Sequence, residues 1–140
     1  MEPRLNILTL GVEDLVTSTN FYSEKFGWKK MKISTDQISF FRLRGMILSL
    51  YQREKLAEDA TVDADGSGFK GFTMAYNARS KDEVDRIIEK LEKRGVTIVK
   101  HPEKVFWGGY SSYVADPDNN LWEIAHNPFL ELDEHGIIKG

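Results

Sequence analysis

The sequence contains no cysteine, which excludes disulfides, thiolate nucleophiles and sulfur-rich zinc sites. It also lacks an apolar run near the roughly 20 residues that span a bilayer. Its first residues, MEPRLNILTLGVEDL, hold too short an apolar stretch for a signal peptide. Together these absences predict a cytoplasmic protein that does not associate with membranes.

An excess of basic charge is missing as well. The chain has 19 Lys and Arg against 22 Asp and Glu, and its net charge is -3. Because nucleic-acid binding needs a concentrated basic surface, nucleic acid is not an expected partner. The length of 140 residues and the hydrophobic content of 41% predict one globular domain, long enough to bury a core.

The hydrophobic pattern repeats once along the chain. The first half predicts a strand, a helix capped by Asp14, three strands and a short helical piece, at residues 5–12, 15–26, 28–34, 38–44, 46–52 and 53–60. The second half predicts a strand, a helix, a strand, a loop and a hairpin, at residues 71–77, 80–95, 96–101, 102–109 and 110–126. In the second helix Ser80 and Glu83 form a capping box, and Gly95 ends it.

Two βαβββ modules predict an α+β fold in which one curved mixed sheet surrounds a cleft. The modules cover about residues 4–57 and 70–128. A tail at 129–140 is expected to form a small hairpin around Asp133 to Gly136.

Two segments carry a family resemblance. ILTLGVEDLVTSTNFYSEKFGW and YVADPDNNLWEIAHNP resemble the opening and closing signatures of the vicinal oxygen chelate superfamily. That group includes glyoxalase I, extradiol dioxygenases and bleomycin resistance proteins. GFTMAYNARS and VFWGGYSSYVADPD look like a subgroup described only as glyoxalase-like. The resemblance implies a homodimer, because many relatives are dimeric.

The resemblance also implies where a metal would bind. Enzymes of the superfamily hold a divalent metal with His, Gln or Glu on the first and last strand of each half. Carried over to this sequence, the four positions are Ile7, Ser49, Phe72 and Glu123. Only Glu123 has a ligand-type side chain, and such sites need three or four protein ligands. We therefore predict no bound metal and no cofactor.

Glu123 is the main candidate for chemistry. One hypothesis places it in a cleft among apolar side chains, namely Ile7, Phe72 and Met74. There it would act as a general base, because apolar surroundings disfavour its charged form, or it would pair with a cationic group on a ligand. The alternative is a structural remnant held by a donor such as Arg42, Tyr51 or a backbone amide. Without a partner nucleophile or acid, ligand contact or a structural role is favoured over catalysis.

The second candidate is the segment VFWGGYSSY. Trp107 and Tyr110 flank Gly108 and Gly109, so bulky aromatic surface lies on a backbone that can bend sharply. One hypothesis is a mobile aromatic lid over the cleft. The other is a glycine bulge, with Trp107 packed at an interface.

The sequence thus predicts a metal-free protein of the glyoxalase/bleomycin-resistance type that binds a small molecule. We expect the ligand to contact Ile7, Ser49, Tyr51, Phe72, Met74, Trp107, Tyr110 and Glu123. The alternative is a glyoxalase-like lyase, isomerase or dioxygenase with a degenerate or unconventional metal site. A dimeric interaction module without a ligand is the third hypothesis, so enzymatic activity stays open.

Overall fold

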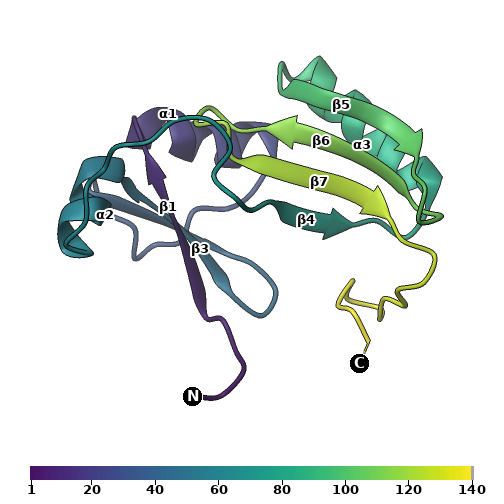
Figure 1. Ribbon diagram of the computed structural model, residues 1–140, viewed down its shortest axis with the longest axis horizontal. Coiled ribbons are helices and arrows are strands. Elements are labelled where there is room, and N and C mark those ends of the chain that lie inside the picture. Colours follow the sequence, from purple (N-terminus) through teal and green to yellow (C-terminus); the bar gives the residue numbers. More distant parts are fainter. Residues whose placement is uncertain (140) are drawn as a thin grey trace. The chain divides into compact units, whose positions relative to one another are not determined.

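The computed structural model describes residues 1–139, and the chain forms two compact units, Met1–Gly68 and the residues from Phe69 onward. Each unit has a mixed β-sheet with helices, which confirms the expected α+β class (Figure 1). The strands form two hydrogen-bonded sheets, one in each unit, rather than one continuous sheet. Within residues 1–139, no helix is long and apolar enough to cross a membrane.

The first unit contains three strands in the order β1-β3-β2, with β1 parallel to β3 and β2 antiparallel to it. Its elements are β1 (Ile7–Val12), α1 (Leu15–Asn20), the π-helical turn η1 (Phe21–Lys25), β2 (Ile38–Arg42), β3 (Ile47–Gln52) and α2 (Arg53–Asp59). Asp14 caps α1 as predicted, because its Oδ1 accepts a hydrogen bond of 2.7 Å from the backbone N–H of Thr17.

The predicted strand at 28–34 is wrong. Only an isolated bridge between Lys30 and Phe41 forms there, and Ser34 N–H closes a turn on Met31. The indole of Trp28 stacks on the ring of Tyr22 with centroids 5.6 Å apart. This aromatic packing holds the segment near the helix, and a continuous strand does not form.

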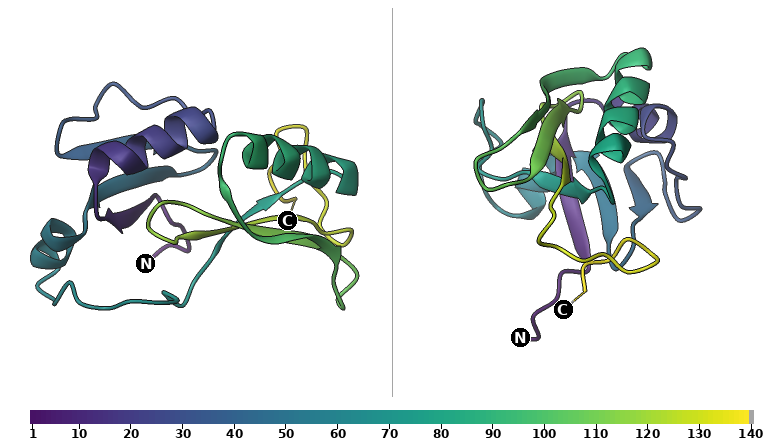
Figure 2. Two further views of the ribbon diagram at one scale, coloured as in Figure 1. Left: turned by 90° about the horizontal axis from the view of Figure 1, so that it is seen from above. Right: turned by 90° about the vertical axis from the view of Figure 1, so that its right-hand side faces the viewer.

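The second unit contains four strands in the order β4-β7-β6-β5, with β4 parallel to β7 and the other pairs antiparallel. Its elements are β4 (Met74–Asn77), α3 (Lys81–Lys93), β5 (Thr97–Lys104), β6 (Tyr110–Ala115) and β7 (Leu121–His126). Helix α3 lies along one face of this sheet (Figure 2). It buries three apolar side chains, Val84, Ile88 and Leu91.

The predicted cap of α3 is half confirmed. Ser80 Oγ accepts a hydrogen bond of 3.1 Å from Glu83 N–H, as a capping box requires. The Glu83 carboxylate accepts from the N–H of Arg79, at 2.6 Å, rather than from Ser80. Gly95 follows the helix with a φ of 77°, a left-handed conformation that glycine adopts without strain.

Strand β5 continues to Lys104, so the predicted loop at 102–109 is too long. Pro102 cannot donate a ladder hydrogen bond, but β5 is an edge strand and tolerates it. The remaining residues, 105–109, form a tight turn in which Val105 and Gly109 are hydrogen-bonded. The expected hairpin in the tail is confirmed by a bridge between Leu132 and Ile138.

The turn between β6 and β7 is held by Asp116, which is only 4% exposed. Its Oδ1 accepts from the N–H groups of Asp118 and Asn120, and its Oδ2 accepts from the side chain of Asn120 at 2.8 Å. These bonds fix the hairpin register, in which Tyr113 lies opposite Glu123.

Candidate functional site

Glu123 lies on the face of the second sheet opposite α3. Its neighbours along β7, Trp122 and Ile124, are buried at 6% and 4% exposure, while Glu123 itself is half-buried. Because successive side chains of a strand point to opposite faces, Glu123 lies on the other side from these two.

One oxygen of the Glu123 carboxylate is already engaged. Ser111 on β6 is buried, and its hydroxyl donates a hydrogen bond of 2.7 Å to Glu123 Oε1. The register places Tyr113 opposite Glu123 on β6 and Ala75 beside it on β4. Among residues 1–139, Oε2 of Glu123 receives no hydrogen bond, so it is the oxygen left for a ligand.

The edge strand β5 adds a charged pair to the same face. Lys100 is in register with Tyr113, and Glu103 is in register with Ser111. The Lys100 ammonium lies 3.0 Å from the Glu103 carboxylate. We name this surface the Glu123 face; it comprises Ala75, Lys100, Glu103, Ser111, Tyr113 and Glu123.

Tyr110 and Met74, both predicted beside Glu123, lie on the α3 side of the sheet. The Tyr110 hydroxyl donates a hydrogen bond of 2.7 Å to Asp85 of α3. That bond raises the pKa of Tyr110 above its usual value, with burial and the charge of Asp85 adding to the effect. Met74 is in register with Trp122 rather than with Glu123. Phe72 precedes β4 and is 43% exposed.

Trp107 packs against its own hairpin. A Cβ atom at Gly109 would lie 1.9 Å from the Trp107 ring, so the indole covers the backbone at a place where only glycine fits. Gly108 has a φ of 92°, and a Cβ there would lie 3.3 Å from the ring of Phe129. The two glycines therefore let two aromatic rings pack on one turn, and Trp107 packs within its own hairpin; its packing at an interface stays a prediction.

The family profile of the Glyoxalase/Bleomycin resistance protein/Dioxygenase superfamily matches residues 4–124. The chain belongs to this superfamily.

Relatives found by structure and by sequence are consistent with that membership. A glyoxalase-related enzyme from Fulvimarina pelagi has a similar structure, with a TM-score of 0.86, 32% identity and 99% of each chain covered. A superfamily member from Nocardioides has a TM-score of 0.77 at 26% identity, over 90% of this chain and 84% of the other. By sequence, the fosfomycin resistance protein FosX of Listeria monocytogenes is 29% identical over 126 residues, 86% of each chain.

Whether a metal fits this chain depends on the side chains at the four positions that bind it in the superfamily. Three of the four, Ile7, Ser49 and Phe72, cannot supply the imidazole, amide or carboxylate ligands of the superfamily's metal enzymes, which leaves only Glu123. Within the described part of the chain, no group of three or more His, Asp or Glu side chains could hold an ion. The donor set therefore does not fit a divalent metal at this position.

The three histidines of this superfamily member have other partners. His101 lies 3.1 Å from Glu92, and His135 lies 3.3 Å from Glu134. His126 Nδ1 lies 3.1 Å from the carbonyl oxygen of Ala78, so it does not share a site with Glu123.

The equivalent face of the first unit carries the remaining predicted residues of the superfamily site. Ile7, Ser49 and Tyr51 share one face of the sheet, because Ile7 is in register with Ile47 and alternate residues of β3 point the same way. The Ser49 hydroxyl is buried, and in residues 1–139 it is the one buried side-chain polar atom without a hydrogen-bond partner. Thr9 lies beside it on β1.

Sequence reasoning missed Ser111, Tyr113, Lys100 and Glu103. The signal for the first two was present in YSSYVA, since the turn around Asp116 fixes which residues of β6 oppose Glu123. Lys100 and Glu103 could not be found from spacing, because β5 is longer than predicted and contains register shifts at Ile98/Lys100 and Lys100/Glu103.

Proposed function

We propose that this superfamily member binds a small organic molecule on the Glu123 face, with the free oxygen of Glu123 as its polar anchor. The observation that carries the proposal is the Ser111–Glu123 hydrogen bond, which orients a half-buried carboxylate and leaves Oε2 available. Ligand sites in proteins commonly combine such a placed polar group with apolar and aromatic surface. Tyr113 and Ala75 supply that surface beside the carboxylate.

The charges of the Glu123 face favour a particular class of ligand. Glu103 and Glu123 carry negative charge, and Lys100 compensates for Glu103 through their 3.0 Å ion pair. The uncompensated carboxylate therefore attracts a cation or a hydrogen-bond donor and repels an anion. We infer a ligand with an ammonium or hydroxyl donor next to an aromatic or apolar body. Contacts from Ile7, Ser49, Tyr51, Phe72 and Trp107, and a homodimeric assembly, stay predictions.

A binding screen on the full chain tests this function. Small amines with an aromatic body are compared with neutral and carboxylated analogues by calorimetry and thermal shift. Glu123→Gln is expected to weaken amine binding about ten- to hundredfold, because a charge-assisted hydrogen bond contributes about 1.5–3 kcal/mol.

Two tyrosine variants provide the matched control. Tyr113→Phe or Tyr113→Ala is expected to change amine binding, while Tyr110→Phe, on the α3 side of the same strand, leaves it unchanged. If every hit binds Glu123→Gln and Tyr113→Ala with the same affinity as the wild type, the assignment of this face is refuted.

A second candidate function rests on the 29% identity with the fosfomycin resistance protein FosX, which extends over 86% of both chains. Fosfomycin is a small anionic phosphonate, and an uncompensated carboxylate on the Glu123 face opposes its binding. Expression in a fosfomycin-sensitive host measures this directly. A clear rise in the inhibitory concentration in cells that express the wild type would replace the first function by this one.

Lyase, isomerase or dioxygenase activity is a third candidate, and it rests on superfamily membership alone. Purified protein is assayed with a hemithioacetal and with a catechol, before and after chelator. Turnover that survives the chelator and is lost in Glu123→Gln would support catalysis without metal. Turnover that requires added metal would support an unconventional site.

A further inference from the structure

Three residues of the Glu123 face form a row across the second sheet. Lys100 on β5 is in register with Tyr113 on β6, and Tyr113 is in register with Glu123 on β7. Because neighbouring strands lie about 4.8 Å apart, the Cα atoms of Lys100 and Glu123 are about 10 Å apart, with Tyr113 between them. The row therefore presents a cation, an aromatic ring and a carboxylate, in that order.

Lys100 points to the same side of the sheet as Glu123. The next residue, His101, lies 3.1 Å from Glu92 of α3, and successive side chains of a strand point to opposite sides. The Lys100 side chain therefore faces away from α3, and it is 37% exposed to solvent. A ligand that is bound by Glu123 and lies along Tyr113 reaches Lys100 at its other end.

Glu103 controls the charge at that end of the row. Its carboxylate lies 3.0 Å from the Lys100 ammonium, and in the described part of the chain it is the one ionic partner of Lys100. An ammonium carries three N–H donors, so two remain for a ligand after Glu103 has accepted one. A ligand anion at this end would lie close to the Glu103 carboxylate and be repelled by it.

We propose that Lys100 and Glu103 together determine which group the ligand carries opposite its amine. Lys100 donates to a neutral oxygen acceptor, and Glu103 excludes an anion, so one residue of the pair attracts and the other repels. The inference rests on the proposed function and narrows its ligand class. The expected ligands are aromatic amines with a carbonyl or hydroxyl oxygen on the far side of the ring.

Calorimetry on the full chain with three probes tests the proposal: benzylamine, its para-carboxamide and its para-carboxylate. The carboxamide is expected to bind about tenfold more tightly than benzylamine, because its oxygen accepts a hydrogen bond from a charged donor. Lys100→Met is expected to bring these two affinities within about twofold of each other. Glu103→Gln is expected to strengthen carboxylate binding about fivefold, because the charge of Lys100 is then uncompensated. The side chains of Lys100 and Glu103 are 37% and 60% exposed, so neither substitution disturbs the core.

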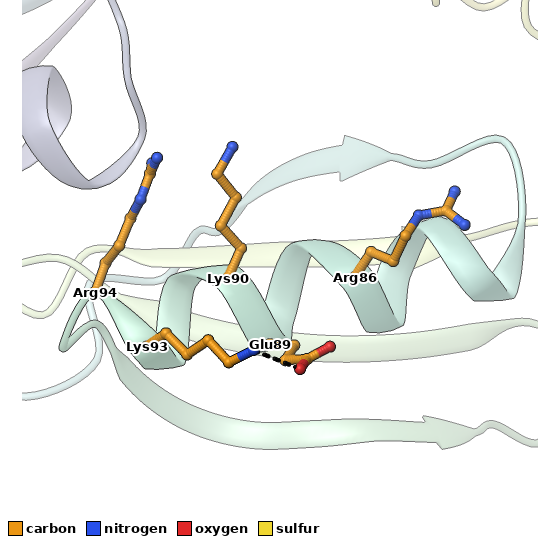
Figure 3. Close-up of a pocket in the computed structure, with 5 residues that line it drawn as sticks. All are labelled: Arg86, Glu89, Lys90, Lys93 and Arg94. Carbon is orange, nitrogen blue, oxygen red and sulfur yellow. Dashed lines mark hydrogen bonds and ion pairs between the residues drawn. The ribbon is translucent and has the colours of Figure 1, made fainter.

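Helix α3 carries cations on the other side of the sheet, and these are a rival site for the carboxylate. Arg86 and Lys90 extend to the same side of the helix (Figure 3) and line a shallow depression of about 320 Å³. Arg86→Met/Lys90→Met is therefore the matched control. In this background the carboxylate is still expected to bind more tightly when Glu103 is replaced by Gln.

The proposal is overturned if the carboxamide gain survives Lys100→Met, or if the carboxylate binds the wild type and Glu103→Gln equally. It is also overturned if the effect of Glu103→Gln disappears in the Arg86→Met/Lys90→Met background. If benzylamine binds and depends on Glu123 but the carboxamide binds no better, the proposed function stands and this inference alone is wrong. If none of the three probes binds, both are wrong.

Discussion

Ser111 on β6 donates a 2.7 Å hydrogen bond to the Glu123 carboxylate on β7, and its neighbour Ser112 donates to the backbone carbonyl of Ile124, also at 2.7 Å. The two serines are adjacent and buried, but they point to opposite faces of the sheet. One serine orients the proposed anchor of the ligand, and the other satisfies a backbone acceptor beneath α3.

Ser111→Ala is therefore expected to weaken ligand binding more than it weakens the fold. Without the hydroxyl, the carboxylate loses its orientation, and affinity is expected to fall about fivefold, the equivalent of about 1 kcal/mol. Ser112→Ala is the matched control, with an expected loss of about 1 kcal/mol in unfolding free energy and unchanged affinity. Calorimetry and urea titration measure the two effects, and equal affinity losses in both variants would contradict the assignment.

Ser49→Ala is expected to stabilise the protein. The Ser49 hydroxyl is buried without a hydrogen-bond partner among the described residues, and such a group costs about 1–3 kcal/mol. Its removal is expected to raise the free energy of unfolding by about 1 kcal/mol in urea titrations.

Ser39→Ala is the control for Ser49, because Ser39 is equally buried but bonded to Thr19 Oγ1 at 2.7 Å. It is expected to destabilise the protein by about 1–2 kcal/mol. If Ser49→Ala destabilises to a similar extent, the hydroxyl has a partner in solution, such as a water molecule.

Gly109→Ala is expected to displace the indole of Trp107, since the new Cβ would lie 1.9 Å from the ring. Overpacking of this kind costs about 1–3 kcal/mol, towards the lower end here because Trp107 is only half-buried. Trp107→Ala removes the clash, so the double variant should recover the loss caused by Gly109→Ala. Additive losses in urea titrations would show that the backbone, and not the indole, requires glycine at 109.

The cap of α1 predicts a dependence of stability on pH. The backbone N–H of Thr17 lowers the pKa of Asp14 below its usual 3.8. The ionised form is therefore favoured in the folded state, and its stabilising effect is present above pH 3.8 and lost as pH falls through the folded pKa. Asp14→Asn keeps a capping oxygen and is expected to remove this part of the acid dependence, as thermal unfolding from pH 2 to 6 would show. An unchanged acid profile in Asp14→Asn would assign the dependence to other carboxylates.

Local signals in the sequence predicted most elements of the second unit. The capping serine at 80, Gly95 after α3, and the alternation in YSSYVA and LWEIAH each identify an element from its own residues. Prediction failed where long-range packing decides. Trp28 joins the aromatic cluster of Tyr22, and the register of β5 depends on its partner strand β6.

In the candidate site too, local signals were sufficient for some features, while others depend on long-range pairing. That Glu123 lies on the face opposite Trp122 and Ile124 follows from alternation within β7, which the sequence alone displays. The separation of Met74 and Tyr110 from Glu123 depends on the pairing of β4 and β6 with β7, which spacing within each strand does not encode. Ser111 could be assigned to Glu123 only after that pairing was known.

The positions of the three tryptophans allow the unfolding of each unit to be followed by intrinsic fluorescence. Trp28 stacks on Tyr22 in the first unit, Trp122 is buried beneath α3 in the second, and Trp107 covers one turn of the second. In a Trp107→Phe background, replacing Trp122 leaves only Trp28, and replacing Trp28 leaves only Trp122. The fluorescence of these two single-tryptophan variants follows the unfolding of each unit separately. Coincident unfolding curves would mean that the two units melt as one cooperative domain, and separate curves would give each unit a stability of its own.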